Sequence, residues 1–536
     1  DEEAIAKRIG MPCFVKPAAD GSSFGVSKVK EADQLAPALR VAFMEAEEAM
    51  VEGFMDGVEI SQGIYKTADK SVVFPATEVV TSNEFFDYDA KYNGQVQEIT
   101  PARLAPETAK KVAETTSRIY DILHANGIIR IDYIISKDQD GNDKINMLEI
   151  NTTPGMTATS FIPQQVRAAG LDPEVFDRLL SNEQFKQVLA YLYPQVPFEM
   201  IAQKLKACKT NMEFQLAFAY DFVHGLLKKA ATGCEMDCSV IDNTRNYTFI
   251  SNHRDIVLDS AILDVLLVDN HFKTTCEIAI GDNLLSLPWV KDLVRVNKAF
   301  IVERALSMRQ MLMSSKRLSD YMHFAIKEKH ENIWIAQREG RAKDSDDRTQ
   351  KSILQMMSMG GEGSIIDRLR QLHLVPLAIS YEYDPCDYLK AKEYQQKRDN
   401  ADWKKGPTDD LVSMQTGIFG YKGHVHYHAA ACVDEFLDTL DPEMPKQDIY
   451  NKVVAYIDHE IHSHYQTYPG NYVALDMLEG TSTYADKYTA EQKAQFEKYI
   501  AGQLAKIDLP NKDEAYLRER LLTMYANPLR NYLAAQ

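Results

Sequence analysis

The chain has 536 residues, a length that predicts about three or four domains of ordinary size. Apolar residues make up 45% and charged residues 26% of the chain, as is typical of globular proteins. The net charge of −18 argues against the dense basic surface that nucleic-acid binding requires, so no nucleic-acid partner is expected.

Cysteine content and hydropathy predict a cytoplasmic location. The seven cysteines lack the spacing of a disulfide framework and are predicted to be reduced thiols. No apolar run approaches the roughly 20 residues needed to cross a bilayer. The first residues, DEEAIAKRIG, predict an acidic helix and no signal peptide, and the abrupt start without Met suggests a fragment of a longer chain.

The first third of the chain has a mixed α/β pattern. Residues 11–165 alternate strand-like runs such as GIIRIDYIIS with helical ones. A helix is predicted from about 106 to 126, where Asn126-Gly127 would end it. Residues 171–244 are then predicted to be helical.

Strand-like runs return after residue 244 as YTFISNH, FIVER, IWIAQ and LVPLAISYEY, and they alternate with helices. From about residue 401 the pattern is again mostly helical. The predicted fold class is therefore α/β and multi-domain, in four segments: 1–170, 171–244, 245–400 and 401–536.

The stretch FVKPAADGSSFGVSKV, residues 14–29, places Lys16 on a strand before a loop rich in glycine and serine. Such a loop can close over nucleotide phosphates with its N–H groups and hydroxyls, while a lysine supplies positive charge. Taken alone, the stretch fits a plain hairpin turn better.

Polar residues interrupt two later strands that otherwise look buried. RIDYII contains Asp132, and NMLEINTTPG contains Glu149 and Asn151, which share one face of a strand with a two-residue period. Three oxygen ligands of this kind suit Mg²⁺ that bridges the phosphates of ATP. The alternative, a solvated strand edge, explains the buried surroundings less well.

Residues 11–170 resemble the C-terminal part of D-alanine–D-alanine ligases, which are ATP-grasp enzymes. The matching segments are VKPAADGSSFGVSKV, EGFMDGVEIS, FFDYDAKY, GIIRIDYII and LEINTTPGMTATSFIP. The resemblance implies a partial ATP-grasp domain, a mixed sheet with helices, that binds ATP, Mg²⁺ and D-alanine.

The same resemblance implies a role for each matching residue. Mg²⁺ would bind Asp132, Glu149 and Asn151, and Ser160 would hold the carboxylate of the second D-alanine. Arg130 and the Gly155 backbone would stabilise the tetrahedral intermediate, and Ser22 and Tyr92 would lie on loops that close the site. ATP would contact Lys16, Ser23, Glu52, Phe54, Met55, Glu59 and Lys91.

The family's N-terminal domain and the start of its central domain have no counterpart in these residues. Because ligation requires both substrates to be oriented, little or no ligase activity is expected from the segment alone. A rival hypothesis makes the chain part of a functional ligase of peptidoglycan precursor synthesis, with the remainder as an appendage. A third hypothesis is a non-catalytic fusion.

The later stretches SNHRDIVLDS, NKAFIVER and IWIAQREGRAKD contain the residue types needed to transfer an acyl group from a thioester to an alcohol. The hydroxyl needs a base, for which histidine suits neutral pH, and the imidazole needs an acid that fixes its tautomer. His253 with Asp255 or Asp259 would supply these groups. Arg304 and Arg341 would hold an anionic acceptor, although each residue alone also fits a surface or capping role.

The order of these blocks resembles the glycerophosphate/lysophospholipid acyltransferase family over residues 181–536. The matching blocks are Asn252-His253…Asp259, Phe300-Ile301…Arg304, Glu339-Gly340-Arg341…Lys343 and Val375-Pro376. The resemblance implies an α/β domain with helical flanks in which His253 is the general base and Asp259 orients it. It implies an acceptor-phosphate pocket shaped by Arg304, Glu339, Gly340 and Arg341.

The chain departs from that family in the spacing of the catalytic pair. Five residues separate His253 from Asp259, where four are usual, and Asp255 lies two positions after the histidine. A turn before the helix can absorb an inserted residue, so Asp259 is favoured as the partner and Asp255 as a helix-capping acid.

The implied donor is a thioester of acyl-carrier protein or coenzyme A, and the implied acceptor is a lipid or lysolipid alcohol. Peripheral contact with the inner face of the membrane is expected, through an amphipathic helix or a basic apolar rim. No metal is expected in the acyltransferase, since HVHYH, DHEIHSH and CEMDC lack a complete ligand set.

Overall fold

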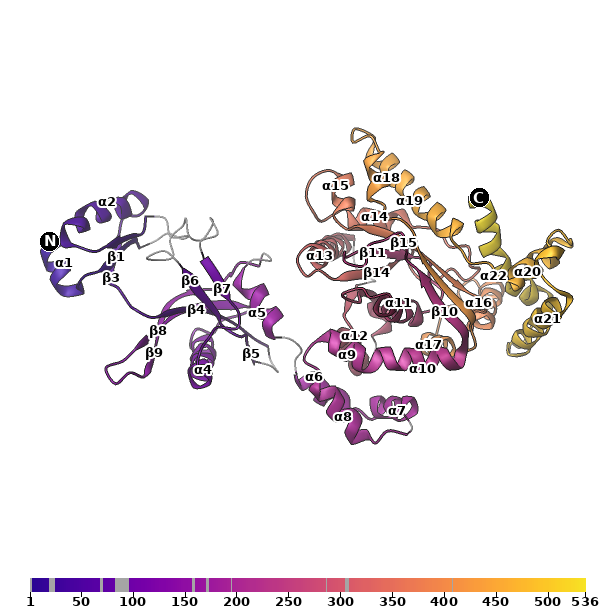
Figure 1. Cartoon of the computed structure of the whole chain (residues 1–536), viewed down its shortest axis with the longest axis horizontal. Coiled ribbons are helices and arrows are strands. Elements are labelled where there is room, and N and C mark those ends of the chain that lie inside the picture. Colours follow the sequence, from indigo (N-terminus) through magenta and orange to yellow (C-terminus); the bar gives the residue numbers. More distant parts are fainter. Residues whose placement is uncertain are drawn as a thin grey trace. The chain divides into compact units, whose positions relative to one another are not determined.

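The computed structural model describes residues 2–18, 25–67, 71–81, 96–156, 160–169, 173–193, 195–285, 287–303, 308–406 and 408–536. The chain separates into two compact units, Asp1–Gly170 and Leu171–Gln536 (Figure 1). The finer boundaries at 244 and 400 stay predictions.

The first unit begins with a small antiparallel sheet. Its strands β2 (Ser27–Val29), β1 (Cys13–Pro17) and β3 (Ala49–Gly53) lie in that order, with helices α1 (Glu2–Ile9) and α2 (Leu35–Glu45) beside them. Side chains of β1 alternate between buried and half-buried, as the two-residue period of a strand requires. Cys13 and Val15 pack against Leu35 of α2.

A larger antiparallel sheet completes the first unit, in the strand order β7-β6-β4-β8-β9 with β5 paired to β4. Helices α4 and α5 pack against β4, and Ile129, Ile131 and Tyr133 of β8 form a core with Val112 and Tyr120 of α4. The bounds are β4 (Val58–Lys66), β5 (Ser71–Val73), β6 (Thr77–Thr81), β7 (Val96–Ile99), α4 (Pro106–Ile122), β8 (Ile129–Lys137), β9 (Asp143–Asn151) and α5 (Phe161–Ala169).

Helix α4 is shorter than predicted: it ends at Ile122 rather than near 126. His124 takes a left-handed conformation with φ of 48°, and the N–H of Ala125 donates to the carbonyl of Tyr120 at 3.1 Å. This bond satisfies a carbonyl of the last helical turn, so the helix has already ended before Asn126-Gly127.

The second unit starts with a helical flank that has its own core around Phe176, Leu205 and Phe214. The elements are α6 (Pro173–Ser181), α7 (Glu183–Leu192), α8 (Phe198–Ala207), α9 (Asn211–Phe214), a π-helical segment (Gln215–Tyr220) and α10 (Asp221–Ala230). The prediction of helix throughout 171–244 is wrong at its end, because Ala231–Asp237 form strand β10.

A mostly parallel sheet follows, in the strand order β10-β16-β15-β11-β14-β12-β13. β16 pairs antiparallel with β15 and parallel with β10, so these two strands run against the rest. The bounds are β11 (Thr248–Ser251), β12 (Cys276–Gly281), β13 (Ala299–Val302), β14 (Asn332–Ala336), β15 (Leu374–Tyr381) and β16 (Gly423–Ala429).

Helices cover both faces of this sheet. α11 lies on one face, and α13, α14 and α19 lie on the other (Figure 1). Their bounds are α11 (Leu258–Asp269), α12 (Pro288–Val296), α13 (Met308–Lys327), α14 (Lys351–Met357), α15 (Ile365–Arg370), α17 (Asp409–Phe419), α18 (Asp434–Asp438) and α19 (Lys446–Ser463). The predicted α/β, multi-domain fold class is confirmed.

The C-terminal helices form a separate core around Phe496, Leu521 and Tyr525. They are α16 (Asp387–Asp399), α20 (Pro469–Glu479), α21 (Ala490–Ala505) and α22 (Glu514–Ala535). Across the described parts of the chain, no helix combines the length and apolar character needed to cross a bilayer.

Candidate functional site

Of the residues predicted for acyl transfer, His253, Asp259 and Arg341 lie at one edge of the second unit's sheet. β11 runs parallel to β14 and β15, so the carboxyl ends of these strands share that edge. His253 follows β11, and the loop that carries Arg341 follows β14. In open α/β sheets this is the edge at which ligands bind.

His253 is oriented by Asp259. Its Nδ1 lies 2.8 Å from Asp259 Oδ2, and because a carboxylate accepts, Nδ1 carries the proton. Nε2 is then left with a lone pair, and 14% of the side chain remains exposed. An imidazole held in this tautomer can take a proton from a hydroxyl group.

The Asp259 carboxylate is fully buried in the first turn of α11. The N–H groups of Arg254 and Asp255 donate to Oδ2 at 2.6 and 3.0 Å, and the Tyr381 hydroxyl donates to Oδ1 at 3.2 Å. The turn after His253 therefore wraps around this carboxylate, which accommodates the additional residue in the spacing.

Asp255 has a different role in the same turn. Its Oδ1 accepts from the N–H groups of Val257 and Leu258 at 2.9 and 2.8 Å, where α11 begins. Burial, followed by the charge of Asp259, raises the pKa of Asp255. A Cβ on Gly417 of α17 would lie 1.9 Å from its Oδ2, so that glycine allows α17 to cover the carboxyl group.

Two further side chains hold the end of β11 in place. The amide of Asn252 donates to the carbonyl of Ile379 at 2.9 Å and accepts from its N–H at 2.8 Å, so it extends the β11–β15 pairing beyond Ser251. The sequence indicated no role for Asn252 or Tyr381. Polar residues at the ends of parallel strands were the available signal.

A buried ion pair joins the turn after His253 to the loop that follows β14, residues 338–350. Arg254 Nη1 lies 3.1 Å from Asp347 Oδ2, and the two side chains are 6% and 0% exposed. The Arg254 guanidinium also lies 5.6 Å from the Tyr465 ring centroid. No sequence motif predicted this pair, since 92 intervening residues fold between its members.

The loop from residue 338 to 350 is held by C-terminal helices. Asn527 of α22 donates to the carbonyl of Asp344 at 2.9 Å, and Arg348 donates to Asn531 at 2.8 Å. Thr349 donates to Asp458 of α19 at 2.6 Å, and Lys343 pairs with Glu393 of α16. Burial lowers the pKa of Lys343 to about 8.

This loop carries the predicted acceptor residues. Gly340 has φ of 68°, a conformation that favours glycine, and the N–H of the exposed Glu339 donates to Gln350 at 2.7 Å. Arg341 is half-buried, and its Nη1 is buried without a hydrogen-bond partner among the described residues. Arg304 lies outside the described residues.

In the first unit, two residues predicted to contact ATP lie on neighbouring strands. Lys16 on β1 and Glu52 on β3 form an ion pair with 2.7 Å between Nζ and Oε1. Phe54 and Met55 follow β3 and are 39% and 38% exposed. Lys28 Nζ lies 4.4 Å from the centroid of the Phe54 ring.

The predicted Mg²⁺ ligands also come together. Arg130 and Asp132 on β8 lie opposite Asn151 and Glu149 on β9. Arg130 Nη2 is 2.7 Å from Asp132 Oδ2 and 3.8 Å from Glu149 Oε1. Burial, followed by the charges of Asp132 and Glu149, raises the pKa of Glu59 to about 7. Acidic groups therefore outweigh the arginine here among the described residues.

Gly155 and Ser160, the two predicted site residues that follow β9, lie close to each other. A Cβ built on Gly155 would lie 2.8 Å from Ser160 Oγ. Arg130 Cζ lies 5.3 Å from the ring centroid of Phe161, the residue after Ser160. Ser22, Ser23, Lys91 and Tyr92 lie outside the described residues.

Comparison with known families matches the two units separately. Residues 1–181 match the model of the D-ala D-ala ligase C-terminus, and residues 237–380 match the acyltransferase model. The chain carries a D-Ala–D-Ala ligase C-terminal domain followed by an acyltransferase domain.

The similar curated proteins correspond to the ligase domain. The D-alanine–D-alanine ligase of Bacteroides fragilis is 62% identical over 183 residues, which are 34% of this chain and 55% of that enzyme. That of Phocaeicola vulgatus is 62% identical over 184 residues, with the same shares. The chain thus spans about half the length of the curated relatives it matches.

A solved structure similar to the ligase domain is the VanG D-Ala:D-Ser ligase from Enterococcus faecalis. It is 33% identical, with a TM-score of 0.28, and the match covers 32% of this chain and 48% of that one.

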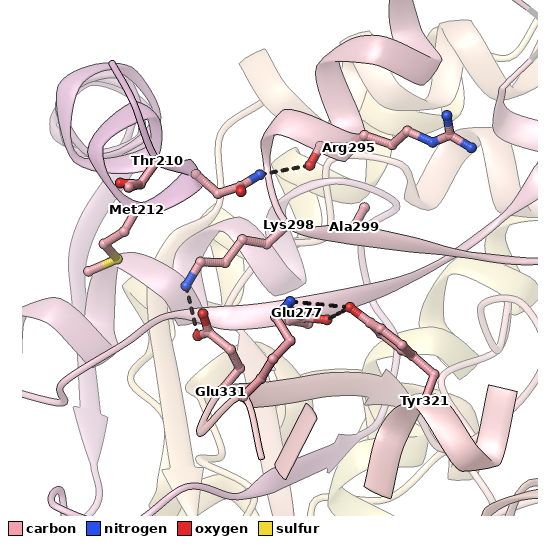
Figure 2. A pocket seen from close by; sticks show the side chains of 10 residues that line it. Thr210, Met212, Glu277, Arg295, Lys298, Ala299, Tyr321 and Glu331 are labelled. Carbon is pink, nitrogen blue, oxygen red and sulfur yellow. Dashed lines mark hydrogen bonds and ion pairs between the residues drawn. The ribbon is translucent and has the colours of Figure 1, made fainter. Parts of the chain in front are cut away.

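A cavity of about 270 Å³ in the second unit is lined by residues that include Glu277, Lys298 and Glu331 (Figure 2). Glu277 stands near the start of β12 and Lys298 directly precedes β13, so the cavity opens at the amino ends of these strands. Lys298 pairs with Glu331 at 2.9 Å, and Lys329 pairs with Glu277. None of the residues predicted for acyl transfer lines this cavity.

Replacement of Arg254 by Met would leave the Asp347 carboxylate buried without its ionic partner. We expect the free energy of unfolding of the acyltransferase domain to fall by about 3–5 kcal/mol, measured by urea unfolding. The matched control, Arg370→Met, removes pairs with Asp367 and the exposed Asp438, and should cost about 1 kcal/mol or less. Equal losses in the two variants would contradict the role of the buried pair.

Proposed function

We propose that the acyltransferase domain moves a fatty acyl group from a thioester to the hydroxyl group of a glycerophosphate- or lysophospholipid-like acceptor. The observation that carries this proposal is the 2.8 Å contact between His253 Nδ1 and Asp259 Oδ2, which leaves Nε2 available as a base. The acyl donor is a thioester of acyl-carrier protein or of coenzyme A.

In the proposed reaction, His253 Nε2 takes the proton of the acceptor hydroxyl as its oxygen attacks the thioester carbonyl. Asp259 stabilises the imidazolium that forms. The tetrahedral intermediate then collapses, the carbon–sulfur bond breaks, and His253 returns the proton to the departing thiolate. No covalent acyl-enzyme is needed, because the base serves the acceptor directly.

Arg341 supports an acceptor with a negative charge. A buried N–H without a partner costs free energy, and the cost is larger for a charged group. A phosphate oxygen that accepts from Arg341 Nη1 would remove this cost with a charge-assisted hydrogen bond. We extend the same acceptor-binding role to Arg304, Glu339 and Gly340 from the family resemblance.

An apolar patch on α13 supports peripheral contact with a lipid surface at the inner face of the membrane. Met311, Leu312 and Met313 are consecutive and are 55%, 63% and 65% exposed. Arg309, Lys316 and Arg317 flank them in the sequence. Exposed apolar side chains beside cations are typical of helices that bind anionic membrane surfaces.

The acyl-transfer proposal is tested with the full chain, a labelled acyl thioester and a panel of lysophospholipids and phosphorylated glycerols. His253→Ala should lower the rate of product formation by about 10²–10⁴-fold. Asp259→Asn should lower it by about 10²-fold or more, because an amide can donate to Nδ1 and favour the wrong tautomer.

The control is Asp255→Asn, whose amide oxygen can still accept from Val257 and Leu258 and should retain activity within about threefold. If Asp255→Asn lost activity while Asp259→Asn kept it, the assignment of the partner acid would fall. Absence of product from every acceptor would refute acyl transfer.

The membrane proposal predicts that Met311→Ser/Leu312→Ser/Met313→Ser weakens sedimentation with vesicles of phosphatidylglycerol. We expect a loss of about tenfold or more, since burial of a large apolar side chain contributes about 1.5–3 kcal/mol. The control Leu411→Ser/Val412→Ser changes exposed apolar residues of α17 instead. Equal vesicle binding by wild type and both variants would remove α13 from the contact.

For the ligase domain we propose binding of Mg²⁺ and ATP, since Asp132 on β8 lies opposite Glu149 on β9 and Asn151 lies next to them opposite Arg130, which brings together oxygen ligands that suit Mg²⁺. Asp132, Glu149 and Asn151 would hold the metal ion. Lys16, Ser23, Glu52, Phe54, Met55, Glu59 and Lys91 would contact the nucleotide. Bound Mg²⁺-ATP would supply the phosphoryl group that activates a carboxylate.

The remaining ligase residues would serve the amino-acid side of this site. Arg130 and the Gly155 N–H would hold developing negative charge, Ser160 would bind a D-alanine carboxylate, and Ser22 and Tyr92 would lie on closing loops. Because the chain spans about half the length of its curated relatives, formation of D-Ala–D-Ala by these 536 residues is not expected.

A fluorescent ATP analogue should bind the full chain in the presence of Mg²⁺ and lose affinity about tenfold or more in Asp132→Asn/Glu149→Gln. The control is Asp138→Asn in the exposed β8–β9 turn, where an amide can replace the carboxylate as an acceptor. An affinity for the ATP analogue that is the same with and without Mg²⁺ would contradict the proposal, as would formation of D-Ala–D-Ala by the chain.

A further inference from the structure

Three side chains of different donor chemistry meet at the end of the sheet opposite to His253. His373 directly precedes β15, and Cys432 and Asp434 follow β16. One potential ligand atom from each lies within 4.8 Å of the other two. β11 and β15 are parallel and begin together at Thr248 and Leu374, whereas His253 follows the other end of β11. The cluster is therefore separate from the proposed acyl-transfer site.

The main chain fixes the three positions relative to one another. The N–H of Thr248 donates to the carbonyl of His373 at 3.2 Å, and the N–H of Val433 donates to the carbonyl of Leu374 at 2.8 Å. These bonds tie the β16–α18 connection to the starts of β11 and β15. The donors consequently lie on a framework that is already formed, which reduces the entropy that a ligand must remove.

Imidazole nitrogen, thiolate sulfur and carboxylate oxygen are the ligands that Zn²⁺ accepts in proteins. His373 Nδ1 and Asp434 Oδ2 are 2.6 Å apart. Asp434 Oδ1 is buried and has no hydrogen-bond partner among the described residues. A buried carboxylate oxygen in this state is unusual, and a coordinated cation would satisfy it.

Cys432 is a thiol before a metal binds. Its burial, with a further contribution from the charge of Asp434, raises its pKa to about 12. Formation of a metal–sulfur bond therefore breaks the S–H bond and releases that proton to solvent. Arg245, Asp434, Tyr247 and Tyr456 interact electrostatically with this thiol.

Arg245 occupies the place of a counter-cation. Its Nη2 lies 3.2 Å from His373 Nδ1 and 3.7 Å from Asp434 Oδ2. Its side chain is 48% exposed, so rotation into water costs little burial. Like charges repel at these distances, so a divalent ion and this guanidinium compete for the same carboxylate.

We propose that His373, Cys432 and Asp434 form a binding site for a thiophilic divalent cation, Zn²⁺ by its ligand preferences, with Arg245 as the competing cation. Three protein ligands leave a fourth tetrahedral position for water or a further ligand. The site takes no part in acyl transfer, for which the sequence predicts no metal.

The probe is Co²⁺, added to the full chain after treatment with a chelator. Wild type should bind one equivalent with a thiolate-to-cobalt absorption band, and Zn²⁺ should displace it. Cys432→Ser should lose the band and weaken Zn²⁺ binding by more than about tenfold. Arg245→Ala should strengthen Zn²⁺ binding severalfold, because the competing charge is gone.

The matched control is Cys208→Ser, since this cysteine belongs to the helical flank and its Sγ donates to the carbonyl of Lys204, a bond that a hydroxyl can replace. It should keep the absorption band and the affinity. Asp434→Asn provides a second ligand variant should Cys432→Ser fail to fold, as judged by thermal unfolding. Absence of a thiolate band in wild type, or unchanged Zn²⁺ affinity in the folded ligand variant, would overturn the proposal.

Discussion

The Asp259 carboxylate determines the geometry around it. Three groups donate to a single oxygen, Oδ2: the His253 ring and the N–H groups of Arg254 and Asp255. The carboxylate lies in the first turn of α11, where the helix dipole stabilises negative charge. The turn, the start of the helix and the direction of the imidazole therefore depend on one carboxylate.

The sequence was sufficient to recognise a ligase segment followed by an acyltransferase segment and to predict the fold class, because long motifs in GIIRIDYII and SNHRDIVLDS specify both strands and polar positions. It did not reveal the conformation of the turn after His253. A six-residue step is off-face on a regular helix, so spacing alone left Asp255 and Asp259 in competition. The structure places Asp259 on the ring and Asp255 on the helix end, since residues 254–257 are outside α11.

Other features could not be predicted because they depend on distant parts of the chain. β10 is an edge strand, and its neighbour β16 begins 186 residues after β10 ends. Nothing within ATGCEMD distinguishes such an edge strand from the end of a helix. The ion pair of Arg254 and Asp347 could not be predicted either, because it forms when folding buries both side chains together. The Arg341 Nη1 group lacks a hydrogen-bond partner among the described residues, which only the folded surroundings reveal. Strand-end polarity indicated where to look, but not which atoms meet.

The attachment of the 338–350 loop to the last helices has a consequence for the order in which the acyltransferase domain matures. Asp344 is anchored by Asn527, a residue that the ribosome adds 183 positions later. Domains fold as units during synthesis, so the acyltransferase domain can finish folding once α22, which carries Asn527 and Asn531, has been synthesised. A chain shortened within α22 before Asn527 would lack two side-chain contacts that hold the 338–350 loop, those with Asp344 and Arg348.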